Sequence, residues 1–373
     1  MVTRFMVWLT ALMGLCAPVS AKDYLVTASH PNSLHLIDVK ARTVVRSMPI
    51  PGDGAPVTIS TTPTGKVAYV LTNHLESVAG IDLETGEQVF RADFSEDDTR
   101  IKSISAMTVG GDGRELFVFQ SPVRLSPSEY QVMDTRIAVY DTSAGVDAKP
   151  VRSFPAPRGI MQLLSSPDGA TLYAFGFDIH TLDARTGESL ATFKMRGWDR
   201  PNLGQPDILT MWTAPDMSGI YAAAYAAPRT DMNPTDPMAW HSGLMLLDLA
   251  TGAIELRDFE RGGPITFSAV VNPVRRNEVY SIYLMFSKLD LSRAIDLDAN
   301  PTDSLVVKRL GAPHTYYNIN ISSDGEEIYL GGTMDDIAIH GTAEMDARGT
   351  IKLPGGGDMA LGFLKMVKWG DAE

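Results

Sequence analysis

The chain contains 373 residues and carries a formal net charge of −13 at pH 7, because 45 acidic side chains outnumber 32 basic ones. Such an acidic balance disfavours non-specific binding to nucleic acid and to anionic membrane surfaces. A chain of this length can bury a sizeable core, either as one large domain or as two.

The first 21 residues have the organisation of a cleavable signal peptide. Arg4 precedes an apolar segment, residues 5–19, and small residues lie just before Lys22. The only cysteine, Cys16, belongs to this segment. The sequence therefore predicts export to the periplasm without a membrane anchor. The mature chain, residues 22–373, can then form neither a disulfide nor a CxxCH haem attachment.

A short turn motif followed by a β-branched or aromatic run recurs roughly every 50 residues. Its six copies are TTPTGKVAYVLT, GGDGRELFVFQ, SSPDGATLYAFG, APDMSGIYAAA, NPVRRNEVYSIY and SSDGEEIYLGG. Each copy leads to a second strand-like run, and these runs end in an apolar-Asp pair except in the last copy, which has Gly341 instead. Each unit is thus predicted to contain four strands joined by tight turns, in which glycine supplies the positive φ.

Four strands per unit of this length are typical of the blades of a β-propeller. Six units run from about residue 56 to residue 354. The N-terminal residues 23–50 supply three further strands, and DMALGFLKMVKW near the C-terminus supplies one. We therefore predict a single all-β domain over residues 22–373, a seven-bladed propeller with four antiparallel strands per blade. The N- and C-terminal strands close it in one shared blade. Six or eight blades remain as alternatives.

Two units are longer than the others, and the excess falls in residues 121–136 and 226–243. Both insertions join the same pair of strands within their units, so we expect both on one side of the propeller, where they would build a binding surface. The alternative is that they are surface loops that have lengthened without gaining a function. A third insertion, residues 296–303, has a D-x-D-x-N spacing but lacks the glycine and the distal glutamate of an EF-hand, so no metal site is predicted.

The mature chain shows no motif for self-contained catalysis. None of its seven histidines falls in an HxxH or HExxH pattern, and there is no G-x-S-x-G nucleophile elbow. The only glycine run, residues 354–358, precedes a predicted strand and not a helix. The residues alone therefore predict an exported propeller with one elaborated face, with no catalytic residue, cofactor or metal of its own.

Five ordered stretches carry a more specific resemblance: QSPVRL, FPAPRGIMQLL, GQPDILTMW, DPMAWHSGLMLLDLATG and PHTYYNINISSDGEEIYLGG. In their order, and in the positions of the two insertions, they resemble the β subunit of quinohemoprotein amine dehydrogenase. The heavy chain of methylamine dehydrogenase is a similar propeller. The resemblance covers nearly the whole mature chain, and the chain departs from it in the 296–303 insertion and at Gly341.

This resemblance implies a periplasmic heterotrimer. In that family the α subunit carries two c-type haems, and the small γ subunit carries cysteine tryptophylquinone and the catalytic base. The propeller holds the γ subunit and helps to wall the substrate pocket. The reaction implied is oxidative deamination of a primary amine to an aldehyde and ammonia, with electrons passing through the haems to a periplasmic acceptor. A cysteine-free mature chain is compatible with a scaffold that binds neither cofactor itself.

Loop position singles out six residues for contact with the γ subunit or with its pocket: Arg124, Trp212, Trp240, His314, Tyr316 and Tyr317. Tyrosine and tryptophan offer a wide contact area with a polar tip. Strand alternation leaves open that Tyr316 or Tyr317 packs within its blade. Arg124 has a local alternative partner in Asp134, and Trp212 could be a core residue.

Two other functional classes remain open from the residues alone. A binding propeller without redox partners predicts a stable monomer. A lactonase-like, metal-dependent propeller hydrolase predicts a divalent ion in the central channel and activity from the single chain.

Overall fold

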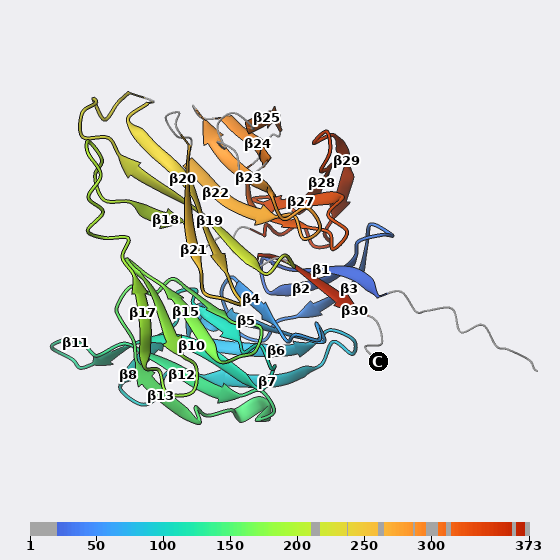
Figure 1. The fold of residues 1–373 in the computed structure, drawn as a ribbon. Coiled ribbons are helices and arrows are strands. Elements are labelled where there is room, and N and C mark those ends of the chain that lie inside the picture. Colours follow the sequence, from blue (N-terminus) through green and yellow to red (C-terminus); the bar gives the residue numbers. More distant parts are fainter. Residues whose placement is uncertain are drawn as a thin grey trace, which may run out of the picture.

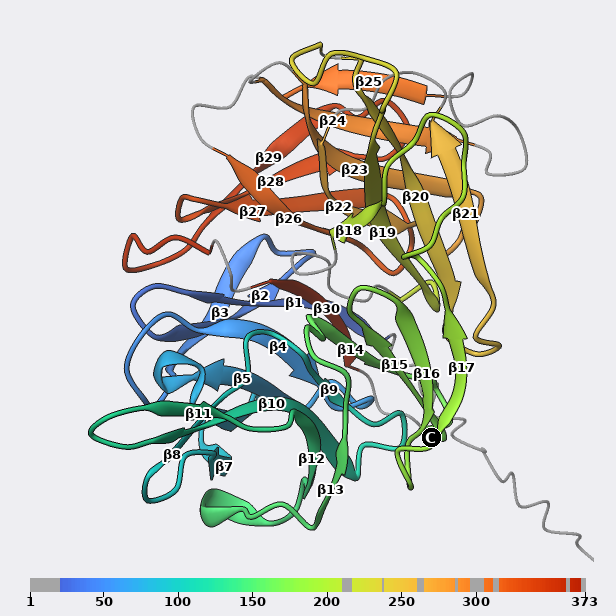
Figure 2. The same ribbon diagram turned by 90° about the vertical axis from the view of Figure 1, so that its left-hand side faces the viewer.

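The structure is a computed structural model, and it describes residues 21–209, 217–236, 238–259, 265–285, 288–295, 305–310, 315–359 and 363–369. Within these ranges the chain is almost entirely β-strand, with two single-turn 3-10 helices, η1 (Asn73–Leu75) and η2 (Gly145–Asp147). The strands form antiparallel sheets arranged around a centre, and Figure 2 looks onto this arrangement.

Six of the sheets contain four strands each. In spatial order, the first contains β3 (Thr43–Pro49), β2 (Ser33–Asp38), β1 (Lys22–Ser29) and β30 (Leu364–Trp369). The second contains β4 (Val57–Thr61), β5 (Val67–Thr72), β6 (Ser77–Asp82) and β7 (Gln88–Asp93). The third contains β14 (Gln162–Ser165), β15 (Thr171–Phe175), β16 (Ile179–Asp183) and β17 (Ser189–Phe193).

The other three four-stranded sheets come from the C-terminal half. They contain β18 (Asp207–Leu209), β19 (Ile220–Pro228), β20 (Trp240–Asp248) and β21 (Ile254–Phe259); then β22 (Ile265–Val271), β23 (Glu278–Met285), β24 (Lys288–Ile295) and β25 (Leu305–Arg309); and last β26 (Tyr316–Ile321), β27 (Glu327–Gly332), β28 (Asp336–Gly341) and β29 (Ala347–Lys352).

One sheet differs from this pattern because it contains the first insertion. It has six strands: β9 (Met107–Val109), β10 (Glu115–Leu125), β12 (Arg136–Asp141) and β13 (Arg152–Pro155), together with β8 (Thr99–Lys102) and β11 (Tyr130–Val132). The prediction of four strands in every blade is therefore wrong here. Six sheets have the four-stranded form, one fewer than the seven predicted, because β10 runs on beyond its sheet and recruits two extra partners.

The two ends of the chain meet in the first sheet. β1 pairs with β30 in antiparallel register, from Lys22 opposite Trp369 to Thr27 opposite Leu364. This sheet thus combines three N-terminal strands with one C-terminal strand, which is the arrangement that the sequence predicts. The protein is an all-β β-propeller with four-stranded antiparallel blades, apart from the one six-stranded sheet.

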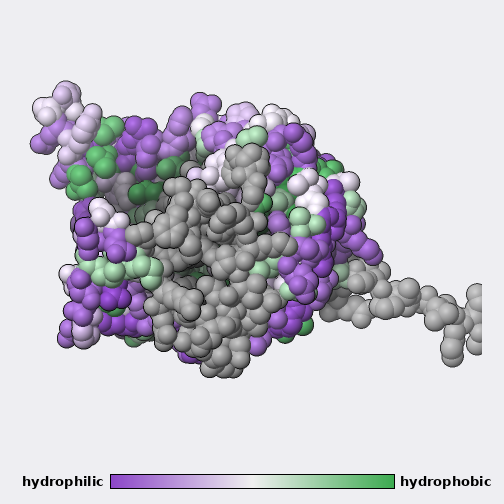
Figure 3. All heavy atoms as spheres, turned by 90° about the horizontal axis from the view of Figure 1, so that it is seen from above, coloured by the Kyte–Doolittle hydropathy of each residue, from purple (hydrophilic) through white to green (hydrophobic). Residues whose placement is uncertain are grey.

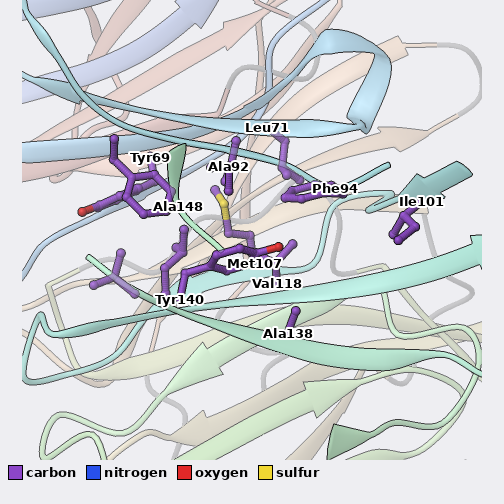
Figure 4. Close-up of a cluster of buried hydrophobic side chains, with 14 of the residues drawn as sticks. Tyr69, Leu71, Ala92, Phe94, Ile101, Met107, Val118, Ala138, Tyr140 and Ala148 are labelled. Carbon is purple, nitrogen blue, oxygen red and sulfur yellow. The ribbon is translucent and has the colours of Figure 1, made fainter. Parts of the chain in front are cut away.

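Packing between sheets comes from apolar side chains on both faces of the inner strands. The structure holds seven buried apolar clusters within the described residues, and each draws its members from two sheets. Figure 4 shows one of them, between the sheet of β4 and the sheet of β9. In it the rings of Tyr69 and Phe90 meet edge to face at 5.4 Å, and Phe90 and Tyr140 do so at 6.2 Å.

The antiparallel order gives the molecule two distinct faces. Turns between first and second strands, and between third and fourth strands, lie on one side, which we name the turn face. Connections from second to third strands, and from each sheet to the next, lie on the other. Because residues 121–135 and 226–243 are of this second kind, we name that side the insertion face.

The repeated Asp residues stabilise turns on the turn face. Asp82 accepts hydrogen bonds from the backbone of Glu84 and Thr85, and Asp248 does the same for Ala250 and Thr251. These carboxylates satisfy the backbone donors of the turn between the third and fourth strands. Where Gly341 replaces the Asp, the Arg348 side chain lies in the space that a Cβ would enter.

Candidate functional site

Both predicted insertions extend the insertion face, as the sequence indicates. The first forms a ribbon in which β10 pairs with β8 on one side and with β11 on the other. Figure 1 shows β11 projecting from the body of the protein. The second lengthens β19 and β20 until Pro228 pairs with Trp240, and Arg229 forms an ion pair with Asp231 at 3.0 Å in the loop beyond.

Exposed apolar side chains gather on the same face. Fourteen large apolar side chains are exposed among the described residues, and eight of them lie on the insertion face: Ile104, Leu125, Tyr130, Val132, Phe177, Met238, Trp240 and Met334. The remaining six are five valines and a leucine. Every aromatic and methionine member of the set is thus on one face, and these residue types are enriched at the centres of protein interfaces. Figure 3 shows green apolar atoms among purple ones on the side that carries β11 in Figure 1.

A polar cluster lies beneath the second insertion, where the sheets of β14 and β18 meet. Asp258 on β21 accepts a hydrogen bond from Tyr225 on β19 and binds Arg200, whose Nη1 lies 2.6 Å from its Oδ2. His241 on β20 approaches the same carboxylate, with Nε2 at 3.4 Å from Oδ1. Burial alone would raise the pKa of Asp258, but His241, Tyr225 and Arg200 together hold it well below its ordinary value.

Gly243 makes the contact between Tyr225 and Asp258 possible. Its position on β20 lies opposite Tyr225, and a Cβ at this residue would fall 2.3 Å from the tyrosine oxygen. The Tyr225 side chain, which is 1% exposed, therefore crosses the glycine to reach Asp258. Burial raises the pKa of Tyr225, so its hydroxyl stays protonated as a donor. This cluster ties three strands to the loop at Arg200.

The residues predicted to contact a partner differ in their exposure. Arg124 lies on the exposed ribbon, but its local carboxylate is Asp98 at 3.8 Å, whereas Asp134 faces Arg158 at 3.9 Å. Trp240 begins β20 and is 42% exposed on the insertion face. Both residues thus have the accessibility that contact with a partner requires.

Of the two neighbouring tyrosines, one is buried and the other is only half-buried, as the alternation of side chains along a strand suggests. Tyr316 is 4% exposed and belongs to the cluster between the sheets of β22 and β26, so its ring is a core residue and the contact predicted for it does not fit the structure. Tyr317 is half-buried, and its carbonyl accepts a hydrogen bond from Ser268 at 2.8 Å. Trp212, His314 and the segment 296–303 lie outside the described residues.

Sequence reasoning missed Phe177, Trp198 and Asp258. The ring of Trp198 lies 5.5 Å from that of Tyr225 and 6.2 Å from that of His241, so these residues form one aromatic group. The contacts join loops and strands of two sheets, and nothing in a short stretch of sequence indicates them. The sole local signal was an aromatic residue placed in the tight turn GFD at 176–178.

A central cavity of about 420 Å³ is lined by the innermost strands β4, β9, β14 and β30. Gln162, on its wall, is 3% exposed, and its side-chain oxygen has no hydrogen-bond partner within the part of the chain described. Across the part of the chain that the structure describes, no three His, Cys, Asp or Glu residues group closely enough to hold a metal ion. None of the helices described is long and apolar enough to cross a membrane.

Comparisons with known proteins support the fold and no more. No family model matches the sequence, and no curated protein matches it. Hydrazine synthase of Kuenenia stuttgartiensis is similar in structure, with a TM-score of 0.59 and 14% identity over 90% of this chain and 100% of that one. The β-propeller domain of Cps50 from Myceliophteria thermophila has a TM-score of 0.53 and 12% identity over 86% and 90% of the two chains.

A third solved structure is the dihydro-heme d1 dehydrogenase NirN in complex with DHE. It has a TM-score of 0.51 and 12% identity over 95% of this chain and 76% of that one. At such identities the likeness establishes the propeller fold alone.

Proposed function

We propose that this protein is the scaffold subunit of a periplasmic quinohemoprotein amine dehydrogenase. Its partners are a di-haem α subunit and a small γ subunit that carries cysteine tryptophylquinone. The complex oxidises a primary amine to an aldehyde and ammonia. The propeller holds the γ subunit, helps to wall its pocket and binds neither cofactor itself. On this proposal residues 1–21 are removed on export, and residues 22–373 form a single seven-bladed ring closed by the pairing of β1 with β30.

One observation carries the proposal beyond the resemblance of the five sequence stretches. The exposed aromatic and methionine side chains gather on the insertion face, where both insertions add surface. A monomer seldom exposes such a set on one side unless that side binds something. The same face carries Arg124 and Trp240. A rigid propeller supplies orientation and water exclusion, which is what a subunit that holds a cofactor needs from its scaffold.

The experiment is to purify the tagged mature chain from the periplasm of its own host grown on a primary amine. The expected preparation contains one large and one small additional chain, a haem c Soret band, and amine-dependent reduction of a dye. A colourless single chain would contradict the proposal and favour a binding propeller. A single chain that hydrolyses lactones and loses that activity with a chelator would favour the hydrolase instead.

Replacement of Trp240 separates the role of the insertion face from mere exposure. The Trp240→Ala variant should yield less haem per propeller chain than the wild type, because an aromatic anchor is lost. Val274, which is 61% exposed on the turn face, offers a matched control. The Val274→Ala variant should retain the wild-type ratio of haem to propeller.

A further inference from the structure

Phe177 and Arg196 form a stacked pair at the surface of the insertion face. Phe177 lies in the turn between β15 and β16, and its side chain is 53% exposed. The Arg196 guanidinium carbon lies 3.5 Å from the centre of the Phe177 ring. In the part of the chain described, Arg196 is an exposed cation with no carboxylate within ion-pair distance.

The loop that presents Arg196 is held firmly. Asp178, next to Phe177, accepts hydrogen bonds from the backbone nitrogens of Met195 and Arg196, both at 3.0 Å. Its other oxygen binds Lys194 Nζ at 2.9 Å. Burial would raise the pKa of Asp178, but these donors keep it below its ordinary value. The turn and the loop therefore form one preorganised unit, which lowers the entropy cost of binding a partner.

The surface around Phe177 and Arg196 continues toward the second insertion. Arg200 lies over the ring of Trp198 at 4.0 Å, and Trp198 contacts His241, the neighbour of Trp240. Lys194 and Arg200 are each neutralised by an aspartate, at 2.9 and 2.6 Å. Arg196 alone among these cations has no such counter-ion among the described residues. Its charge is therefore left for an external group, in a chain whose net charge is −13.

We propose that the Phe177–Arg196 pair binds an acidic segment of a partner subunit. A guanidinium stacked on a ring keeps its edge N–H groups free, and these match a carboxylate in a bidentate geometry. The exposed ring of Phe177 would cover an apolar side chain adjacent to that carboxylate. The inference rests on the proposed function, because it takes the insertion face to be the face that binds the other subunits.

A second copy of this chain is a poorer occupant of the same surface. A two-fold contact through the patch would bring Arg196 of one copy toward Arg196 of the other. Like charges brought together in this way oppose association. An acidic segment meets no such repulsion, so charge complementarity selects it.

The decisive experiment replaces Phe177 by the photoreactive residue p-benzoylphenylalanine, which preserves an aromatic ring, in the complex purified from the host. Illumination should join residue 177 to a peptide of another subunit that contains an aspartate or a glutamate. A peptide without acidic residues, a peptide from a second copy of this chain, or no cross-link would each overturn the inference. Residue 177 is exposed, so the substitution leaves the core unchanged.

A competition experiment measures how much Arg196 contributes to assembly of the complex. Wild-type and variant chains with different tags are produced together, and the ratio of the two chains in the haem-containing complex is measured by mass spectrometry. The Arg196→Glu variant should be taken up at least about tenfold less well than the wild type. The Arg196→Lys variant, which keeps the charge but loses the planar fork, should lie between them.

Arg114 provides the matched control, because its side chain is 86% exposed on the turn face. The Arg114→Glu variant should compete equally with the wild type. Uptake of the Arg196→Glu variant at the level of the Arg114→Glu variant would overturn the inference while leaving the proposed function intact. Absence of any haem-bearing partner from the wild-type preparation would overturn both.

Discussion

The turn face and the insertion face differ in the side chains that they expose. On the turn face, arginines reach from one sheet to the next and find partners there. Arg275, which also binds Glu278 of its own sheet, binds Glu326 of the next sheet at 2.9 Å, and Arg42 binds Glu327 at 2.7 Å. The other large exposed apolar residues, which lie on this face or on the outermost strands, are five valines and a leucine. These ion pairs link neighbouring sheets on this face.

The insertion face instead exposes aromatic side chains. Arg196 has no carboxylate partner in the described residues, and the exposed residues there include Tyr130, Phe177 and Trp240. Stability and recognition are therefore separated: the turn face carries ion pairs that link neighbouring sheets, whereas the insertion face carries exposed aromatic residues that can contact a partner.

The largest effect on stability should come from acidification at the insertion end of the first sheet. His35 is 1% exposed, and its two ring nitrogens lie 2.8 Å from the hydroxyls of Ser29 and Ser47. Burial lowers the pKa of His35 to about 4. The unfolded chain therefore binds the proton first as the pH falls from about 6.5 to 4. In that window the free energy of unfolding should decrease by up to about 3 kcal/mol.

Denaturant unfolding at pH 7.0, 5.5 and 4.5 measures this decrease. The His35→Gln variant is the control, because its side chain does not titrate in the window. The variant should lose less stability than the wild type between pH 6.5 and 4, whatever its stability at pH 7. Equal pH dependence in the two proteins would show that other groups dominate the acid response.

A smaller effect should follow from loss of the carboxylate beneath the second insertion. The Asp258→Ala substitution removes the acceptor of the buried Tyr225 hydroxyl and the ion-pair partner of Arg200. We expect the free energy of unfolding to fall by about 2 kcal/mol, since a buried donor is left unsatisfied. The Asp258→Asn variant retains an oxygen for Tyr225 and should fall less. If both variants have the same free energy of unfolding as the wild type, the cluster does not stabilise this end of the sheet.

On the turn face, a single Asp should matter less than the Asp258 cluster. Asp248 accepts two backbone hydrogen bonds and one from the Thr251 hydroxyl, so the Asp248→Ala substitution should cost about 1 kcal/mol. The Asp248→Asn variant keeps the side-chain acceptor and should cost less. Thermal unfolding of the two variants tests the order, and a larger loss from Asn than from Ala would show that the acceptor role is misassigned.

These differences explain which parts of the molecule the sequence could predict. The turns around Asp82 and Asp248 depend on residues within a few positions, and the strand repeat between them is equally local. The pairing of β1 with β30 was predictable because each end of the chain lacked strands that the other supplied. By contrast, Tyr225 and Asp258 meet only because Gly243 leaves room between them, and Phe177 meets Arg196 only through the packing of a turn against a loop. Such contacts between distant segments leave no pattern in a short stretch of sequence.

The smallest stability effects should occur at the exposed apolar residues, where the two faces are expected to differ only in recognition. Trp240 is 42% exposed and Val274 is 61% exposed, so replacement of either by alanine should change the free energy of unfolding by less than about 0.5 kcal/mol. Only the Trp240→Ala variant should assemble less well with haem-bearing partners. If Val274→Ala impaired assembly equally, the turn face would also bind a partner, and the separation of stability from recognition between the two faces would fail.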